Sequence, residues 1–114
     1  MEEYKNLFKG KIGIILTNLG TPNAPTKKAL KKYLNQFLMD KRVVDINRLL
    51  WIPLLKLIIL NVRPKKSAKL YKKIWTNDGS PLMMHMNKIK NQIAKNYSKK
   101  SDKFHFEIAM RYGD

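Results

Sequence analysis

The sequence predicts an α/β fold in which helices flank a parallel sheet. Two stretches have the composition of strands, residues 11–18 and residues 104–112, and the chain between them is dominated by helical periodicity. Strands joined through helices pair in parallel, because the helices carry the chain back to the same end of the sheet. At 114 residues, the chain has the size of one small domain or of part of a larger one.

The first predicted strand, residues 11–18, is an isoleucine-rich run that lies between Gly and Pro residues. This composition is typical of a central parallel strand that is buried on both faces. The strand leads into a turn in which Gly20 allows the backbone to bend tightly and Pro22 stiffens it. Asn18 and Thr21 present an amide and a hydroxyl group to whatever binds at this end of the strand.

The segment after this turn predicts the clearest helix of the chain. Thr26 is placed to cap it. Apolar residues recur at helical spacing on one face, and lysines occupy the other. The apolar face consists of Leu30, Tyr33, Leu34, Phe37 and Leu38, and the basic face of Lys27, Lys28, Lys31 and Lys32.

Residues 49–62 form an almost continuous apolar segment that only Lys56 and Asn61 interrupt. About fourteen residues are too few to span a bilayer, which takes about twenty. Pro53 is expected to break or kink a helix here. The segment is therefore either a core helix of a larger fold or an exposed apolar lip that touches a membrane or an apolar ligand.

The rest of the chain predicts two more helical pieces and a strand. Residues 64–75 form the first piece, and Ser80 and Pro81 provide the N-cap and first position of the second. Residues 104–112 alternate between apolar and polar, which predicts a half-buried strand. The helical faces expected to be buried consist of Ala68, Tyr71, Ile74 and Trp75 in the first piece and Leu82, Met86, Ile89 and Ile93 in the second.

Both strands are predicted to end at the same edge of the sheet, where open α/β sheets bind ligands. At this edge Arg111 offers a fork for a carboxylate or phosphate, and Tyr112 an aromatic wall with one hydroxyl. The helix that begins at Ser80 adds free N–H groups that can cradle an anion. The inferred ligand is flat or apolar and carries acidic substituents. Each feature alone also fits a structural role, as a simple turn, a surface salt bridge or a common helix start.

The chain is strongly basic, with 24 Lys and Arg against 8 Asp and Glu and a formal net charge of +16. This charge attracts nucleic acid, an anionic membrane face or an acidic ligand, and it also fits a solvated lysine coat. The absence of cysteine excludes a disulfide framework and a thiolate metal site, and it fits a reducing compartment. The first ten residues lack the apolar stretch of a secretory signal, so a cytoplasmic location is expected.

Four blocks of the sequence stand out: "LTNLGTPNAPT", "YLNQFLMDKRVVD", "RPKKSAKLYKKIWTNDGSPL" and "AMRYGD". Together they resemble the amino-terminal part of the ferrochelatase family in order and spacing, from Lys11 to Asp114. The resemblance implies an enzyme that inserts ferrous iron into protoporphyrin IX to form protohaem. It also implies two similar Rossmann-like halves with the porphyrin cleft between them, of which residues 1–114 are an incomplete first half without the second domain.

The resemblance implies porphyrin-binding roles for Leu19, Arg111, Tyr112 and Arg63. Leu19 is expected to pack on the macrocycle, and Arg63 to lie near the cleft mouth. Arg111 and Tyr112 are expected to hold the substrate or to shape the path to its centre. For residues 49–62 the resemblance favours the lip, which rests on the bilayer in membrane-associated members. The implied partners are porphyrin, ferrous iron and a peripheral membrane contact, with no nucleic acid; iron and porphyrin are substrates, and no cofactor is expected.

Metal insertion needs a base that removes the two pyrrole protons and ligands that strip water from Fe²⁺. The family takes these groups from a His and from acidic residues in later motifs, which this sequence does not contain. His85 and His105 do not match the catalytic His, and neither has a partner ligand at metal spacing. We therefore assign no catalytic and no metal-binding residue, and we expect the chain alone to be inactive or nearly so.

Two other interpretations are open from the residues alone. The net charge, together with Tyr71, Trp75 and Tyr97, fits a small nucleic-acid-binding protein, although no RNP, zinc-finger or helix-turn-helix pattern is present. A membrane-surface protein that uses residues 49–62 as its anchor overlaps with the lip interpretation.

Overall fold

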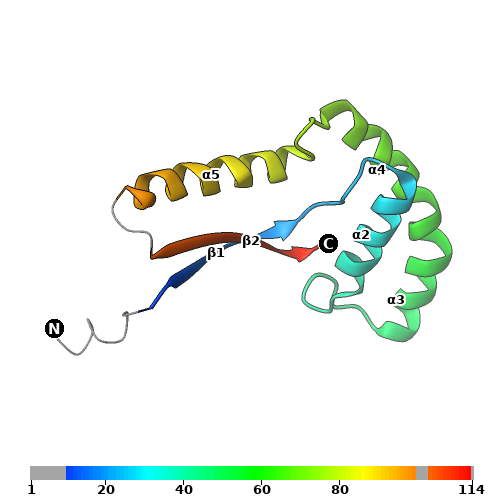
Figure 1. The fold of residues 1–114 in the computed structure, drawn as a ribbon. Coiled ribbons are helices and arrows are strands. Elements are labelled where there is room, and N and C mark those ends of the chain that lie inside the picture. Colours follow the sequence, from blue (N-terminus) through cyan, green and yellow to red (C-terminus); the bar gives the residue numbers. More distant parts are fainter. Residues whose placement is uncertain (1–9, 100–102, 114) are drawn as a thin grey trace.

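The computed structural model describes residues 10–99 and 103–113, which form two strands with helices between them (Figure 1). Helix α5 lies alongside the sheet, and the other helices gather near the carboxyl ends of the strands. The predicted α/β fold with flanking helices is confirmed. The elements in chain order are β1 (Ile12–Gly20), α2 (Lys27–Met39), α3 (Arg48–Leu54), the π-helical turn η1 (Leu55–Ile59), α4 (Leu60–Ile74), α5 (Pro81–Ser98) and β2 (Phe104–Tyr112).

Strands β1 and β2 are parallel neighbours, as the pattern of the sequence predicts. Ile12 pairs with Phe104 at the start of the sheet, and Gly20 pairs with Tyr112 at its end. β1 extends two residues beyond the predicted range of 11–18. The parallel register brings the turns that follow the two strands to the same edge.

Helix α5 covers one face of this sheet, and the other face is exposed. Phe106, on the face toward α5, is buried, and the Phe104 ring packs 5.3 Å from the Tyr97 ring of that helix. On the opposite face Ile15 is 64% exposed and Leu19 is 49% exposed. The expectation that the first strand is buried on both faces is therefore wrong for the described residues, because only one face has a helical layer against it.

Helix α2 forms where the capping residue and the apolar stripe predict it. The Thr26 hydroxyl accepts a hydrogen bond from the Ala29 backbone N–H at 3.3 Å, which satisfies a donor of the first turn. The buried positions of the helix follow one another at intervals of four, so they share a face. They are Leu30, Leu34 and Leu38.

The main apolar core lies between α2 and the helical run from Arg48 to Ile74. Within this core Trp51 donates its indole N–H to the Leu38 carbonyl at 2.8 Å, so the buried indole nitrogen has a hydrogen-bond partner. The buried residues of the cluster are Leu34, Leu38, Trp51, Leu55 and Leu60.

The helical run from α3 to α4 is continuous, which the sequence did not predict. The regular α-helix ends one residue after Pro53, and η1 widens the helix so that the Leu60 N–H donates to the Leu55 carbonyl. The Asn61 side-chain amide donates to the Leu57 carbonyl at 2.8 Å, which adds a side-chain hydrogen bond to the widened turn. The expected separate piece at 64–75 is therefore the second part of one long run.

Residues 49–62 are both core and surface. Trp51 and Leu55 are buried, whereas Leu49 is 85% exposed, and Leu50 and Leu57 are each 71% exposed. One side of the segment therefore belongs to the core, and the other side is apolar and exposed. Among residues 10–99 and 103–113, no helix is long and apolar enough to cross a membrane.

Helix α5 begins at the predicted residue, but its apolar face is less buried than predicted. The Ser80 hydroxyl caps it by accepting from the Met83 N–H at 3.3 Å, and Met86 is buried. Ile89 is 45% exposed, because the two-stranded sheet is too narrow to cover the full stripe. On α4, the expected burial of Ile74 is also wrong, since its side chain is 54% exposed.

We predict that Leu55→Ala lowers the free energy of unfolding by about 2–5 kcal/mol, because Leu55 is fully buried in the α2 core. The measurement is urea unfolding of the protein that carries this sequence, followed by fluorescence. Leu49→Ala, at an exposed position of the same helical run, serves as the matched control and is expected to change the free energy by less than about 0.5 kcal/mol. Equal losses in the two variants would contradict the location of the core.

Candidate functional site

The turns after β1 and β2 interlock through two glycines. Gly20 and Gly113 both have positive φ values, 121° and 89°. A Cβ atom at Gly20 would overlap the Tyr112 carbonyl, and one at Gly113 would overlap the Thr21 carbonyl. The tight turn predicted at Gly20 therefore needs glycine for two reasons. The backbone has a positive φ value there, and the neighbouring strand lies too close for a side chain.

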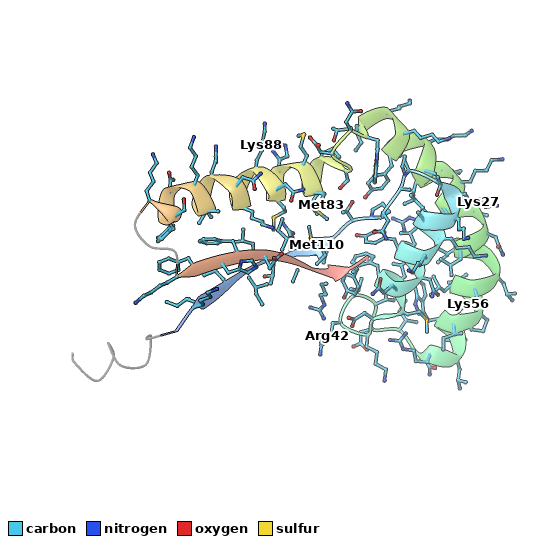
Figure 2. The ribbon with its side chains drawn as sticks, viewed as in Figure 1. Lys27, Arg42, Lys56, Met83, Lys88 and Met110 are labelled. Carbon is cyan, nitrogen blue, oxygen red and sulfur yellow. The ribbon has the colours of Figure 1, made fainter. Side chains whose placement is uncertain are left out.

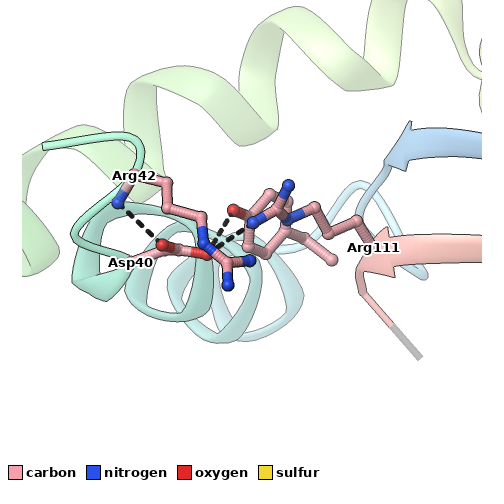
Figure 3. Close-up of polar contacts among 4 residues, drawn as sticks. Asp40, Arg42 and Arg111 are labelled. Atoms are coloured by element: carbon pink, nitrogen blue, oxygen red, sulfur yellow. Dashed lines mark hydrogen bonds and ion pairs between the residues drawn. The ribbon is translucent and has the colours of Figure 1, made fainter.

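Asp40, the residue after α2, connects this helix to the end of β2 (Figure 3). One carboxylate oxygen accepts from the Tyr112 hydroxyl at 2.7 Å and from the Arg111 guanidinium at 3.2 Å. The other oxygen accepts from the Arg42 backbone N–H at 2.8 Å. Asp40 was missed by the sequence reasoning, although a signal exists: Asp40 and Asp45 are the only acidic residues between positions 27 and 74.

The hydrogen bond from Tyr112 holds the pKa of Asp40 below its usual value, and the Arg42 N–H and the Arg111 guanidinium act in the same direction. Burial, followed by the hydrogen bond to Asp40, raises the pKa of Tyr112. The carboxyl is thus ionised and the phenol protonated near neutral pH. This arrangement keeps Tyr112 as a donor and Asp40 as an acceptor.

Aromatic contacts fix the Tyr112 ring against α2. Tyr112 is 4% exposed, and its ring meets that of Phe37 edge-on, with ring centroids 5.2 Å apart. Phe37 in turn stacks on Tyr33, whose hydroxyl donates to the Gly20 carbonyl at 3.3 Å. The ends of both strands are therefore held by the same helix.

Three of the four sequence-predicted site residues meet at this edge. Leu19 is half exposed on the face of the sheet away from α5, and alternation along the strands places Arg111 on the same face. Tyr112 lies next to Arg111 with its hydroxyl directed at Asp40. Arg63 is exposed on α4 and makes no hydrogen bond or ion pair with any described residue, so the structure does not join it to this cluster.

The start of α5 offers less for an anion than the sequence suggests. Pro81 has no N–H, and the Met83 and Met84 N–H groups are bonded to the Ser80 hydroxyl and carbonyl. Only the Leu82 N–H of the first turn is left for a ligand. A pocket of about 250 Å³ lies between this helix start and the turn after β1, lined by Thr21, Pro22, Asn23, Trp75, Asp78, Gly79, Ser80 and Met83.

The two histidines lie outside this edge cluster. His105 is exposed and bonds Glu107 at 2.9 Å, and Glu107 also pairs with Lys90 of α5 at 3.6 Å. The hydrogen bond with His105 is the main reason why the pKa of Glu107 is lowered. His85 is exposed on α5. Within the described ranges, no three His, Cys, Asp or Glu side chains gather in a group that could hold a metal ion.

Comparison with known proteins gives a consistent family match. The family model described as Ferrochelatase matches residues 11–114. The chain is 52% identical over 113 residues to a protein named ferrochelatase from Pseudoalteromonas atlantica, which covers 98% of this chain and 31% of that protein. It is 50% identical over 107 residues to a ferrochelatase from Wigglesworthia glossinidia brevipalpis, covering 94% of this chain and 32% of the relative.

A third relative, the ferrochelatase of Alcanivorax borkumensis, is 45% identical over 114 residues, with 99% of this chain and 33% of the relative covered. The chain thus spans about a third of the length of the curated relatives that it matches. No solved structure matches it significantly.

We predict that Tyr112→Phe raises the pKa of Asp40, because it removes the hydrogen bond that lowers this pKa most. A folded-state pKa below the unfolded value stabilises the protein above a pH of about 3.9, and this contribution is lost as the pH falls through the lower folded value. In the variant this contribution should therefore be smaller, and its loss should be complete at a higher pH. ¹³C NMR titration of the Asp40 carboxyl measures the shift.

Tyr33→Phe is the matched control for this titration, because its hydroxyl donates to the Gly20 carbonyl and not to Asp40. An unchanged Asp40 pKa in Tyr112→Phe, or an equal shift in the two variants, would show that the Tyr112 contact does not control this carboxyl.

Proposed function

Because the chain belongs to the ferrochelatase family, we propose that the protein that contains it inserts ferrous iron into protoporphyrin IX to form protohaem. The match of the family model over residues 11–114 carries this proposal. The geometry supports it, since the ends of β1 and β2 meet at one edge with an arginine, a buried tyrosine and an exposed leucine. Open α/β sheets bind their ligands at such an edge.

The described residues suit the binding part of the reaction. Leu19 is apolar and half exposed, as a residue that packs on a flat macrocycle should be. Arg111 carries a side chain that is 45% exposed, so a porphyrin carboxylate can reach it while Asp40 holds its other side. Tyr112 orders this edge through its contacts with α2, and Arg63 is available at the surface of α4.

The proton-removing base and the groups that desolvate and deliver Fe²⁺ are proposed to come from outside residues 1–114. Metal insertion requires both functions at the centre of the ring. His85 and His105 are exposed, and His105 bonds Glu107 rather than the cluster around Arg111 and Asp40. The chain alone is accordingly proposed to bind porphyrin at most and to be inactive or nearly so in metal insertion, with no resident cofactor.

The protein is further proposed to be cytoplasmic and to touch the membrane peripherally through residues 49–62. The support is the exposed outer side of this segment, where Leu49, Leu50 and Leu57 face away from the core. The nucleic-acid-binding alternative has no support from the relatives described above, all of which are named ferrochelatases.

We predict that the purified full protein converts Fe²⁺ and protoporphyrin to protohaem, which the change in the porphyrin absorption spectrum follows. Porphyrin binding should persist between 50 and 200 mM salt, whereas binding to nucleic-acid phosphates loses about a thousandfold or more in this range. Porphyrin binding that is absent, or that weakens as steeply as nucleic-acid binding does, would contradict the proposed function.

We predict that Arg111→Ala in the full protein lowers kcat/KM about 10–100-fold, as expected for the loss of one charged hydrogen bond to substrate. Its unfolding midpoint should change little, because the guanidinium is partly exposed. Asp40→Asn removes the same ion pair and leaves Arg111 in place, so it should cost less activity. If Arg111→Ala unfolded the protein but its folded fraction kept normal activity, or if Asp40→Asn cost as much activity, a direct substrate contact by Arg111 would be wrong.

A further inference from the structure

Asp40 places a negative charge beside the arginine of the sheet edge. Its side chain is 24% exposed and that of Arg111 is 45% exposed, so both charges act on a ligand at this edge. Asp40 accepts from one nitrogen of the guanidinium at 3.2 Å. A guanidinium carries five N–H donors, so Arg111 keeps donors for a second carboxylate on its open side.

The position of Arg111 beside this carboxylate is fixed from two directions. Its guanidinium carbon lies 5.4 Å from the centre of the Tyr112 ring, which is a cation–π distance. Asp40 holds the guanidinium from another side, and is itself held by the Tyr112 hydroxyl and the Arg42 backbone N–H. A ligand carboxylate that reaches Arg111 therefore also lies close to the Asp40 carboxylate.

Joining α2 to the strand ends does not require this negative charge. Tyr33 donates to the backbone carbonyl at the end of β1, and Gln36 accepts from the backbone N–H that follows β2. Two neutral side chains of the helix thus already hold both strand ends. Asp40 makes the third such contact, and the hydrogen bond from Tyr112 holds its pKa below the usual value, so it is charged at neutral pH. The charge therefore indicates a role beyond anchoring.

This acidic residue stands out in a basic chain. The sequence has 24 Lys and Arg against 8 Asp and Glu, and two acidic residues between positions 27 and 74. Lys27 and Lys56 lie on the outer side of the helical layer, away from Met110 and the end of β2 (Figure 2). The basic surface attracts anionic ligands in general, whereas Asp40 offsets the charge of Arg111 at the proposed site.

We propose that Asp40 determines the substrate specificity of this edge by limiting the number of carboxylates that it accepts. One porphyrin carboxylate binds the open side of Arg111, and the fixed charge of Asp40 repels further carboxylates nearby. Protoporphyrin is a dicarboxylate whose other two rings carry apolar vinyl groups, whereas coproporphyrin carries a carboxylate on every ring. Asp40 therefore favours the dicarboxylate. This inference rests on the proposed function and deepens it, because it names the residue that selects the porphyrin.

The test compares the two porphyrins as substrates of the full protein. In Asp40→Asn the ratio of kcat/KM for coproporphyrin to kcat/KM for protoporphyrin should rise about three- to fivefold, through KM, because a repulsive charge is removed. Asp40→Ser, a second neutral variant, should change the ratio in the same direction. Both substrates are measured on one preparation, so a loss of folded protein cancels in the ratio. The gain should shrink as salt is added, and an unchanged ratio would overturn the proposal.

Three further variants separate the charge of Asp40 from its other properties. Asp45→Asn removes the same charge from an exposed position between α2 and α3 and should leave the ratio unchanged. Asp40→Glu keeps the charge and should keep the ratio. Gln36→Leu removes a neutral contact between α2 and the end of β2, and it should also leave the ratio unchanged. An equal rise in Asp45→Asn would indicate an effect of overall charge, and an equal rise in Gln36→Leu an effect of anchoring; either result would overturn the proposal.

Porphyrin binding without iron separates this inference from the proposed enzyme activity. Porphyrin fluorescence gives the Kd of each porphyrin for the unmodified protein and for Asp40→Asn, whether or not iron is inserted. A shift of the Kd ratio toward coproporphyrin in a protein that inserts no iron would support the role of Asp40 and remove the proposed metal insertion. Iron insertion into protoporphyrin with the same ratio in both proteins would remove only the role of Asp40.

Discussion

Helix α2 holds the carboxyl ends of both strands, and the arrangement of the site depends on this contact. An isolated pair of strands is marginally stable in water, so their ends need a partner that orders them. Tyr33 bonds the carbonyl at the end of β1, and Gln36 accepts from the Gly113 N–H at 2.9 Å after β2. Asp40 adds the bonds to Tyr112 and Arg111. The same helix buries its leucines in the core, so one rigid element connects packing and site.

Local signals in the sequence predicted most of the elements, because these signals act within a few residues. Thr26 and Ser80 cap the helices that they were expected to cap, and the alternation of residues 104–112 gives the strand β2. Parallel pairing followed from the helices between the strands. The exposure of Ile15 could not be predicted in the same way, because composition shows that a strand can be buried but not what packs against it.

The part of the site that the sequence predicted is the part in which strand topology alone determines where the residues lie. A parallel register necessarily brings the residues at the ends of the two strands together, which is why Leu19, Arg111 and Tyr112 share an edge. Asp40 lies 71 residues from Arg111 in the chain, and no local pattern points to such a contact. Arg63 belongs to a helix whose orientation depends on how α4 packs on α2, and sequence periodicity did not describe that helix correctly.

The π-helical turn η1 sets that orientation. It adds one residue to a helical turn, which shifts the helical phase of everything after it by about 100°. The inward-facing positions therefore step by four, five, four and four along the run, through Trp51, Leu55, Leu60, Pro64 and Ala68. In an unbroken α-helix the fourth of these positions would fall on Arg63 and bury a charge. A homologue that lacks one residue within 55–59 could thus form a regular helix and still bury the same positions. A one-residue gap at this place in a sequence alignment would then indicate that the packing of the core is conserved.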